Sequence, residues 1–224
     1  MIVAIDGPAG SGKSSTARLL AEKLGFLYLD TGSMYRAVAL QFQRLGTVVT
    51  DDRIHQILES LSIEIVSDSS GMHVLLNGED VTHNIRSKQV TDFSSKVSAI
   101  PEVRDKLVAE QRRMAMSAEE NGSGVVMEGR DIGTVVFPDA DIKFFLVAAP
   151  EERAKRRVLQ KEESGETADY AQILTDIKNR DERDSTRQTS PLRQAEDAIM
   201  VDTTTLSFEE QVGIMESAIR ERCG

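Results

Sequence analysis

The sequence contains a single cysteine, Cys223, and no tryptophan among its 224 residues. One cysteine supports neither a disulfide framework nor a cysteine-based metal site, and it favours a reducing compartment. The longest mostly apolar stretch, Ile142–Pro150, includes Lys143 and is far too short to span a bilayer. No basic leader or cleavage site precedes the first apolar run, so we expect a cytoplasmic protein that does not enter membranes.

Positive charge is also scarce, because 27 lysines and arginines face 37 acidic residues and the formal net charge is −10. A general nucleic-acid-binding protein normally carries a basic face, so this balance argues against that class. An acidic chain that binds polyanions must gather positive charge locally, which makes the placement of its arginines informative. The three histidines lack metal-ligand spacing. No expected helix shows a broad exposed apolar stripe, so we expect a monomer.

Residues 7–14 read GPAGSGKS and fit the pattern G-x-x-x-x-G-K-[ST]. An apolar strand, Met1–Asp6, precedes this loop and an amphipathic helix, Ser14–Leu24, follows it, which is the context in which the pattern binds phosphate. We expect backbone N–H groups of the loop and the helix N-terminus to point at the phosphates. Lys13 would lie beside the β- and γ-phosphates, and the Ser14 hydroxyl would be a ligand of Mg²⁺.

Five short apolar runs are typical of buried parallel strands: Ile2–Ile5, Leu27–Leu29, Val125–Met127, Ile142–Val147 and Ala198–Val201. Helical stretches separate them, which predicts an α/β fold with a doubly wound, five-stranded parallel sheet flanked by helices. Four acidic residues end these strands, namely Asp6, Asp30, Glu128 and Asp202. Ligands gather at the carboxyl ends of such strands, so we expect the first three near the site; alternatively, each caps the turn after its strand.

Residues 62–82 interrupt the alternation of strand and helix. Residues 63–66 alternate in polarity, residues 72–76 form a second apolar run, and the dipeptide Asn77-Gly78 is typical of a type I′ hairpin turn. Residues 79–82 would form a third strand. The segment therefore predicts a small antiparallel insert, which is either a decoration or part of a substrate-binding subdomain.

Residues 151–193 are dense in charge, and Arg180, Arg183 and Arg187 follow one another at i, i+3 and i+7, close to one face of a helix. Such a run is either a solvated helix with many salt bridges or a lid whose guanidinium groups close over a transferring phosphoryl group. Arginine suits the second role because its planar fork binds phosphate through two hydrogen bonds and keeps its charge.

Two further runs follow expected strands. In the run 128–131, Arg130 can reach a phosphate and Asp131 can accept hydrogen bonds from an acceptor nucleotide, unless the two side chains pair with each other. In the run 30–36, which follows the expected strand Leu27–Leu29, we expect Ser33 to cap a helix over residues 34–45. Arg36 would then lie in the first turn, where its charge opposes the helix dipole, which makes it a candidate phosphate ligand.

The phosphate-binding loop alone does not separate GTPases, motor ATPases and small-molecule kinases. The sequence lacks an N-K-x-D motif, a suitably placed D-x-x-G motif and an apolar run that ends in Asp-Glu, so a compact kinase remains. No general base is obvious, and none is needed if the nucleophile is an ionised phosphate oxygen. A kinase for another small acceptor and an adaptor that binds ATP without turnover remain the alternatives.

The chain resembles the bacterial-type cytidylate kinases, a family of P-loop nucleoside monophosphate kinases. The resemblance covers essentially the full length and rests on Ile5–Ser15, Leu29–Leu40, Asn77–Ser87, Val97–Leu107, Glu128–Leu146, Ile177–Arg187 and Val201–Ser207. It implies transfer of the γ-phosphoryl group of ATP to CMP or dCMP with Mg²⁺. We therefore expect three parts: a core of about 1–32, 101–150 and 195–224, an acceptor-nucleotide region of about 33–100, and a lid of about 151–190.

The resemblance also implies roles for individual residues. The ATP phosphates would be held by Gly7, Pro8, Ala9, Gly10, Ser11, Gly12, Lys13, Ser14 and Ser15. The acceptor CMP would be held by Thr31, Arg36, Ser95, Arg104, Arg130, Asp131, Arg180 and Asp184. The catalytic residues would be Lys13, Arg130, Arg180 and Arg187. Glu128 replaces an aspartate of some relatives, and its role stays open.

The assignment to cytosine has a physical basis beside the resemblance. Asp131 can accept a hydrogen bond from the exocyclic amino group of cytosine, and Arg104 can donate to N3 and O2. Uracil presents the opposite donor and acceptor at N3 and C4, which would leave buried groups unpaired and disfavour its binding.

Overall fold

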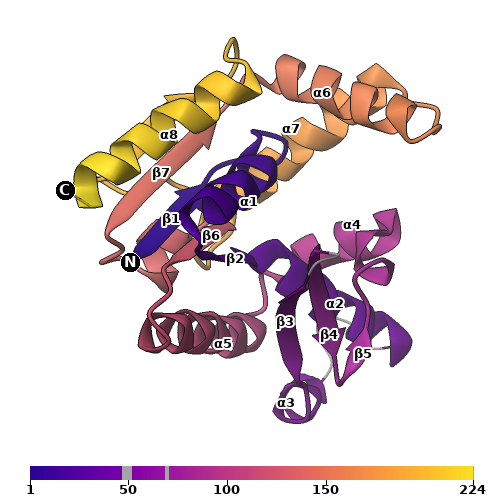
Figure 1. Ribbon diagram of the computed structural model, residues 1–224. Coiled ribbons are helices and arrows are strands. Elements are labelled where there is room, and N and C mark those ends of the chain that lie inside the picture. Colours follow the sequence, from indigo (N-terminus) through magenta and orange to yellow (C-terminus); the bar gives the residue numbers. More distant parts are fainter. Residues whose placement is uncertain (47–51, 69–70, 224) are drawn as a thin grey trace. The chain divides into compact units, whose positions relative to one another are not determined.

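The computed structural model describes residues 1–46, 52–68 and 71–223 (Figure 1). Its elements in chain order are β1 (Ile2–Asp6), α1 (Lys13–Leu24), β2 (Leu27–Asp30), α2 (Thr31–Arg44), α3 (Ile54–Glu59), β3 (Ile63–Asp68), β4 (Gly71–Leu76), β5 (Glu79–Asp80), η1 (Asn84–Arg86), α4 (Lys88–Val97), α5 (Pro101–Glu120), β6 (Val125–Gly129), η2 (Ile132–Val136), β7 (Ile142–Val147), α6 (Pro150–Glu163), α7 (Tyr170–Thr186), β8 (Ile199–Asp202) and α8 (Phe208–Cys223). Here η1 is a 3₁₀ turn and η2 is a π-helical turn. No helix in the described ranges has the length and apolar composition needed to cross a membrane.

The chain forms two compact units, one of Met1–Tyr28 with Ala115–Gly224 and the other of Leu29–Met114. The larger sheet has five strands in the order β2-β6-β1-β7-β8, and β1 pairs in parallel with both β6 and β7. The fold predicted from the sequence is therefore confirmed. Because β1 lies between two strands that come much later in the chain, its carboxyl end is a point where the winding direction switches, and ligands bind at such points.

Helices cover the sheet of the first unit, which explains why its strands are mostly apolar runs rather than alternating ones. All residues of β1 and β6 are buried. Helix α1 packs on β6 and helix α8 on β7, and these two helices also contact each other (Figure 1). Helix α1 ends at Gly25, whose left-handed backbone lets its N–H reach the carbonyl groups of Ala21 and Glu22.

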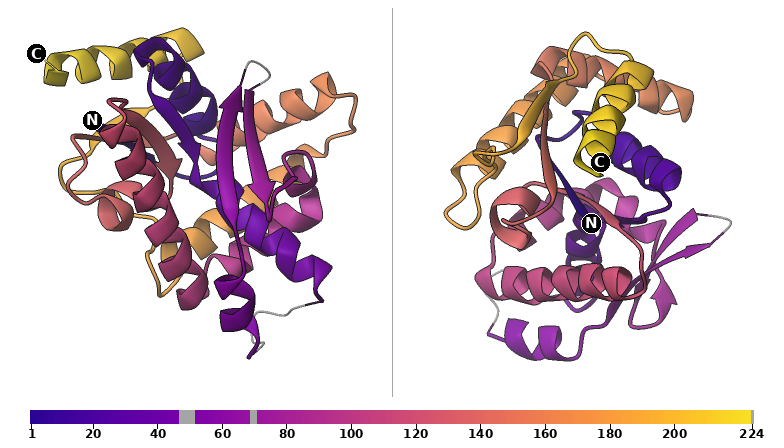
Figure 2. Two further views of the ribbon diagram at one scale, coloured as in Figure 1. Left: turned by 60° about the horizontal axis from the view of Figure 1, so that its bottom comes forward. Right: turned by 60° about the vertical axis from the view of Figure 1, so that its left-hand side comes forward.

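The second unit contains the predicted antiparallel insert, a three-stranded sheet in the order β3-β4-β5 (Figure 2). Asn77 and Gly78 both have positive φ angles, 51° and 82°, as a type I′ turn requires. The third strand is shorter than the expected 79–82, because the Thr82 hydroxyl accepts a hydrogen bond from the Val74 N–H at 2.9 Å. The insert packs with α2 and α4 on a buried core that includes Phe42, Val74 and Leu107.

The predicted start of helix α2 is wrong. The helix begins at Thr31 rather than Met34, and its N-cap is Asp30, whose carboxylate accepts a hydrogen bond from the Ser33 N–H at 3.0 Å. The Ser33 hydroxyl instead donates to the Asp30 carbonyl at 2.6 Å. Arg36 consequently lies in the second turn of the helix, and its guanidinium group pairs with Asp30 at 2.8 Å. The argument from the helix dipole therefore loses its basis, although Arg36 remains a candidate phosphate ligand.

Replacing Gly7 with alanine should destabilise the fold by about 3 kcal/mol or more. Gly7 has a φ of 147°, and a Cβ atom there would lie 2.1 Å from the Leu146 carbonyl oxygen, a backbone atom that cannot rotate away. Urea unfolding followed by circular dichroism gives the change in unfolding free energy. Gly122→Ala is the control, since Gly122 has a φ of 77° but no described heavy atom within 4 Å of a Cβ. Equal losses for both variants would contradict the assignment to the clash.

Candidate active site

The loop between β1 and α1 (residues 7–12) joins a buried strand to a helix N-terminus. Gly12, with a φ of 92°, is the N-cap of α1 and carries no capping side chain, so the first N–H groups of the helix face the loop. The Lys13 side chain folds back across the loop, where its ammonium group donates to the Pro8 carbonyl at 2.6 Å and approaches the Ser11 hydroxyl at 3.4 Å. Lys13 is 4 % exposed, so this charge is held inside the protein.

The electrostatic environment of Lys13 is short of negative charge. Burial, with Arg130 and Arg180 acting in the same direction, lowers its pKa to about 7 against the opposing effects of Glu128 and Asp6. Burial likewise raises the pKa of Asp6 to about 6, although its carboxylate accepts hydrogen bonds from two N–H groups at the start of η2. Both shifts indicate that the site disfavours isolated charges, and a bound anion would reverse the effect on Lys13.

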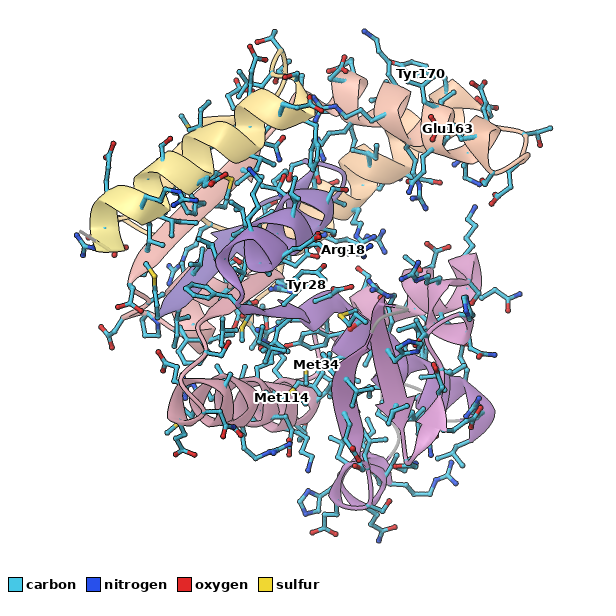
Figure 3. The ribbon with its side chains drawn as sticks, in the orientation of Figure 1. Arg18, Tyr28, Met34, Met114, Glu163 and Tyr170 are labelled. Atoms are coloured by element: carbon cyan, nitrogen blue, oxygen red, sulfur yellow. The ribbon has the colours of Figure 1, made fainter. Side chains whose placement is uncertain are left out.

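Glu128 at the end of β6 lies against the start of α1. Its carboxylate accepts one hydrogen bond from the Ser14 hydroxyl at 2.9 Å and another from the Tyr28 hydroxyl at 2.5 Å. The Arg18 guanidinium group lies 5.8 Å from the centre of the Tyr28 ring, and Figure 3 labels both residues. The sequence left the role of Glu128 open and did not single out Tyr28, because nothing in a short apolar strand shows which carboxylate its hydroxyl will meet.

A second cluster of charges forms where the loop after β6 meets α7. The Arg130 guanidinium group donates to the Asp184 carboxylate at 2.8 Å, and Arg180 lies 4.0 Å from the same oxygen. Arg187 pairs with Asp131 at 3.7 Å. Burial raises the pKa of Asp184, but these arginines outweigh burial and hold the pKa below its usual range. The structure thus brings five of the predicted residues together within one unit.

One alternative and one interpretation drawn from the sequence are wrong here. Arg130 and Asp131 do not pair with each other, because each has an ionic partner at the C-terminal end of the α7 segment. Arg180, Arg183 and Arg187 also do not share a helix face. Helix α7 ends at Thr186, so Arg187 follows it as the C-cap, while Arg183 is exposed and bonds the Asn179 carbonyl of its own helix.

The remaining predicted acceptor residues belong to the second unit. Arg36 pairs with Asp30, and its buried Nε atom has no hydrogen-bond partner among the described residues. Arg104 is buried, donates to the Ser98 carbonyl at 3.3 Å and lies over the ring of Tyr35. Ser98 in turn donates to the Ser95 carbonyl at 3.0 Å, which links Ser95 to Arg104 through one residue. Thr31 is buried as the first residue of α2.

Three side chains that the sequence did not predict support the phosphate-binding loop from the later part of the chain. Arg153 donates to the Ala9 carbonyl at 3.0 Å, and Thr203 donates to the Ser11 carbonyl at 3.2 Å. A Cβ atom on Gly12 would lie 3.0 Å from the amide group of Gln211. Arg153 and Thr203 thus hold the loop through two of its carbonyl groups, and the sequence gives no local signal for these contacts.

Comparison with known proteins agrees with this geometry. The family model described as cytidylate kinase matches residues 3–221. The chain belongs to the cytidylate kinase family. It is 48 % identical to the cytidylate kinase of Rhodococcus jostii (strain RHA1), covering 100 % of this chain and 96 % of the relative. It is 50 % identical to that of Caldicellulosiruptor saccharolyticus, covering 93 % and 90 %.

Solved structures agree on the fold of this cytidylate kinase family member. The unliganded structure of a sugar kinase from Janibacter sp. HTCC2649 aligns with a TM-score of 0.50 at 13 % identity, over 98 % of this chain and 94 % of the other. At that identity the likeness bears on the fold alone. The family resemblance read from the sequence is confirmed, whereas the roles of the individual residues remain predictions.

The low pKa of Lys13 predicts proton uptake when a nucleoside triphosphate binds. In the free protein the pKa is about 7, so most Lys13 is uncharged at pH 8. A bound polyphosphate stabilises the ammonium form and raises the pKa, so binding at pH 8 should take up close to one proton and binding at pH 6 almost none from this group. Isothermal titration of ATP in buffers of different ionisation enthalpy measures the uptake. Lys13→Arg, which stays charged, is the control, and equal uptake by both proteins at pH 8 would contradict the prediction.

Proposed function

We propose that the chain transfers the γ-phosphoryl group of ATP to CMP or dCMP and releases ADP with CDP or dCDP. The observation that carries this proposal is the electrostatic contact between the phosphate-binding loop and the arginine cluster, since Arg130 and Arg180 lie close enough to lower the pKa of Lys13. A donor loop and cations for a moving phosphoryl group therefore belong to one site. Membership of the cytidylate kinase family supports a cytidine nucleotide as the acceptor.

On the donor side, we assign the ATP phosphates to the loop and the first turn of α1, Gly7 to Ser15. N–H groups at a helix N-terminus suit phosphate oxygens, and Lys13 adds a positive charge that is already buried at the loop. Catalysis then needs no general base, because the attacking atom is an oxygen of an acceptor phosphate that is ionised at neutral pH. The protein contributes position and charge neutralisation.

The arginine cluster supplies that neutralisation. Arg130, Arg180 and Arg187 are each paired with a carboxylate of Asp184 or Asp131. We infer that these carboxylates hold the guanidinium groups in place until phosphate oxygens take over as partners. Asp184 and Asp131 are then available to the sugar and the base of the acceptor. Guanidinium groups suit the moving phosphoryl group because they offer two parallel hydrogen bonds without losing charge.

The residues around Ser14 fit a Mg²⁺ ion. Mg²⁺ prefers oxygen ligands, keeps several waters and binds in kinases through few protein groups and the substrate phosphates. Ser14 donates its hydroxyl proton to Glu128 at 2.9 Å, which leaves the oxygen lone pairs for a ligand. When bound near the Ser14 hydroxyl, Mg²⁺ would neutralise negative charge that develops on the phosphates during transfer. The described residues hold no group of three or more His, Cys, Asp or Glu side chains suited to a metal, which is consistent with a site built on substrate oxygens.

For the acceptor base, we assign Arg104, Ser95 and Asp131. Arg104 is fixed by Ser98 and by the Tyr35 ring, so its guanidinium group is ordered before any ligand arrives. Ordered donors favour cytosine over uracil because the mismatched base would leave buried polar groups unpaired. Thr31 and Arg36 would contact the sugar and the phosphate of the same nucleotide.

Helices α6 and α7, which we call the α6–α7 hairpin, would form the lid. Figure 3 labels Glu163 and Tyr170, the last residue of α6 and the first of α7. Closing this hairpin over the site would exclude water, which otherwise competes as a phosphoryl acceptor. The division into core, acceptor region and lid, the monomeric state and the cytoplasmic location remain predictions.

An assay of ADP release with Mg²⁺, ATP and a panel of acceptors tests the function. We expect ADP formation with CMP and dCMP, much less with UMP, and none above background with AMP or shikimate. Asp131→Ala should lower kcat/KM for CMP about 100-fold or more, because it removes a charged hydrogen-bond partner of the base, while the Kd of ATP changes less than about 3-fold.

Asp139→Ala, a substitution at an exposed carboxylate on the same segment, is the control and should behave as the wild type. An adaptor would release no ADP in response to any acceptor. A kinase with another substrate would prefer a different member of the panel. Equal effects of Asp131→Ala on ATP and CMP would remove Asp131 from the acceptor site.

Glu128→Gln should raise the Mg²⁺ concentration needed for half-maximal activity about 10-fold or more, as loss of an outer-shell partner of a metal site does. The substitution keeps the shape but weakens acceptance from the Ser14 hydroxyl. Tyr28→Phe should shift the same requirement in the same direction by a smaller factor, since it frees one Glu128 oxygen and leaves its charge. Activity titrations with Mg²⁺ at saturating nucleotides measure both shifts. An unchanged requirement in Glu128→Gln would contradict the placement of the metal.

A further inference from the structure

Arg153, in the first turn of α6, carries a guanidinium group that the proposed reaction does not use. The residue is 3 % exposed. A buried cation near a helix N-terminus is unfavourable on two counts, because it loses its hydration and opposes the helix dipole. Its partners must therefore compensate for both costs, and these partners indicate what the residue does.

The partners of Arg153 lie on three different segments. Its Nε donates to the Ala148 carbonyl at 2.9 Å, just before α6. Its Nη1 donates to the Ala9 carbonyl of the phosphate-binding loop at 3.0 Å. Nη1 and Nη2 together donate to the two carboxylate oxygens of Asp181 on α7, at 3.0 and 2.5 Å. The loop also packs against the side-chain stem, since a Cβ atom on Gly10 would lie 3.4 Å from the Cβ of Arg153.

This arrangement differs from the other supports of the loop. Thr203 and Gln211 reach the loop from the segment that follows β8, whereas Arg153 binds the loop and α7 with the same planar group. Asp181 is the neighbour of Arg180 in sequence and lies one turn before Asp184. A bidentate arginine–carboxylate pair fixes both distance and orientation. The position of the loop backbone at Ala9 is thus transmitted to the part of α7 that carries Arg180.

We propose that Arg153 is a positioning residue that couples the phosphate-binding loop to the arginine cluster of α7. Through Asp181 it fixes the position of Arg180 relative to the donor phosphates. Binding of the donor and placement of Arg180 are therefore coupled. The inference rests on the proposed function, which makes the loop the donor site and Arg180 a cation for the transferring group. It predicts a loss in kcat rather than in affinity.

The chain offers a matched control in the same hairpin. Lys178 on α7 pairs with Glu151 on α6 at 3.1 Å, and both side chains are about half exposed. This pair joins the same two helices one turn away from Asp181. Lys178→Met therefore removes an α6–α7 ion pair and leaves the link to the loop in place.

The experiment measures kcat, KM for CMP and the Kd of ATP for Asp181→Asn, Arg153→Met, the double variant and Lys178→Met. Asp181→Asn leaves the hydrogen bonds of Arg153 to Ala148 and Ala9. It removes the carboxylate charge and replaces the bidentate link to α7 with one acceptor oxygen at most. We expect its kcat to fall about 10-fold with KM and Kd within about 3-fold, while Lys178→Met stays within about 2-fold in all three. The double variant should lose no more than Arg153→Met alone, because both single changes cut one link. Asp181→Glu should recover part of the kcat.

Each other outcome overturns the inference. If Asp181→Asn has the kcat of Lys178→Met, or if the single effects multiply in the double variant, then Arg153 does not act through Asp181. If Asp181→Asn lowers the melting temperature but leaves kcat unchanged, the pair is only structural. Should Arg153→Met fail to fold, Asp181→Asn and Asp181→Glu still decide the question. A wild-type protein without CDP formation would refute the proposed function itself, whereas an active wild type with an unaffected Asp181→Asn refutes only the coupling.

Discussion

The site depends on keeping several cations buried and close together in a protein whose net charge is −10. Burial is the main reason that Lys13 has a pKa of about 7, and repulsion by the nearby Arg130 and Arg180 lowers the pKa in the same direction. Carboxylates of the same unit, chiefly Asp184, Asp131 and Glu128, offset part of this repulsion. The arrangement is therefore stable enough to fold but remains favourable to incoming anions. A phosphate group that binds these buried cations is attracted to them more strongly than the partner in a surface salt bridge, because less water screens the charges.

The shape of the donor loop is a second constraint, and it comes from the backbone rather than from charge. Gly7 passes so close to the Leu146 carbonyl that a side chain has no room, and Arg153, Thr203 and Gln211 contact the loop from the later part of the chain. The N–H groups of a loop held in this way need little reordering when phosphate arrives. Preorganised dipoles of this kind are the larger part of catalysis by electrostatic stabilisation.

Local patterns let the sequence predict the strands, the type I′ turn at Asn77-Gly78 and the phosphate-binding loop. These features depend on residues within a few positions of each other, which a pattern can show. The pairs Tyr28–Glu128 and Arg153–Asp181 join residues far apart in the chain, and no local signal specifies them. The prediction of where α2 starts failed for a different reason. Asp30 and Ser33 are both good caps, and only the observed backbone shows which side chain accepts the bond.

Composition alone could not show which arginines of residues 151–193 have which role, because in the sequence they form one charge-dense run. Geometry separates them by how readily their partners can be exchanged. Arg180 and Arg187 meet carboxylates at 4.0 and 3.7 Å, at distances where a phosphate oxygen can take over at little cost. Arg153 meets its carboxylate, Asp181, through two short bonds, and it also bonds carbonyl groups of the phosphate-binding loop and of the segment before α6. In this run, long contacts to carboxylates mark the arginines whose anionic partner a phosphate can replace, and the short bonds of Arg153 to a carboxylate and to the loop mark an arginine that holds the framework in which the others act.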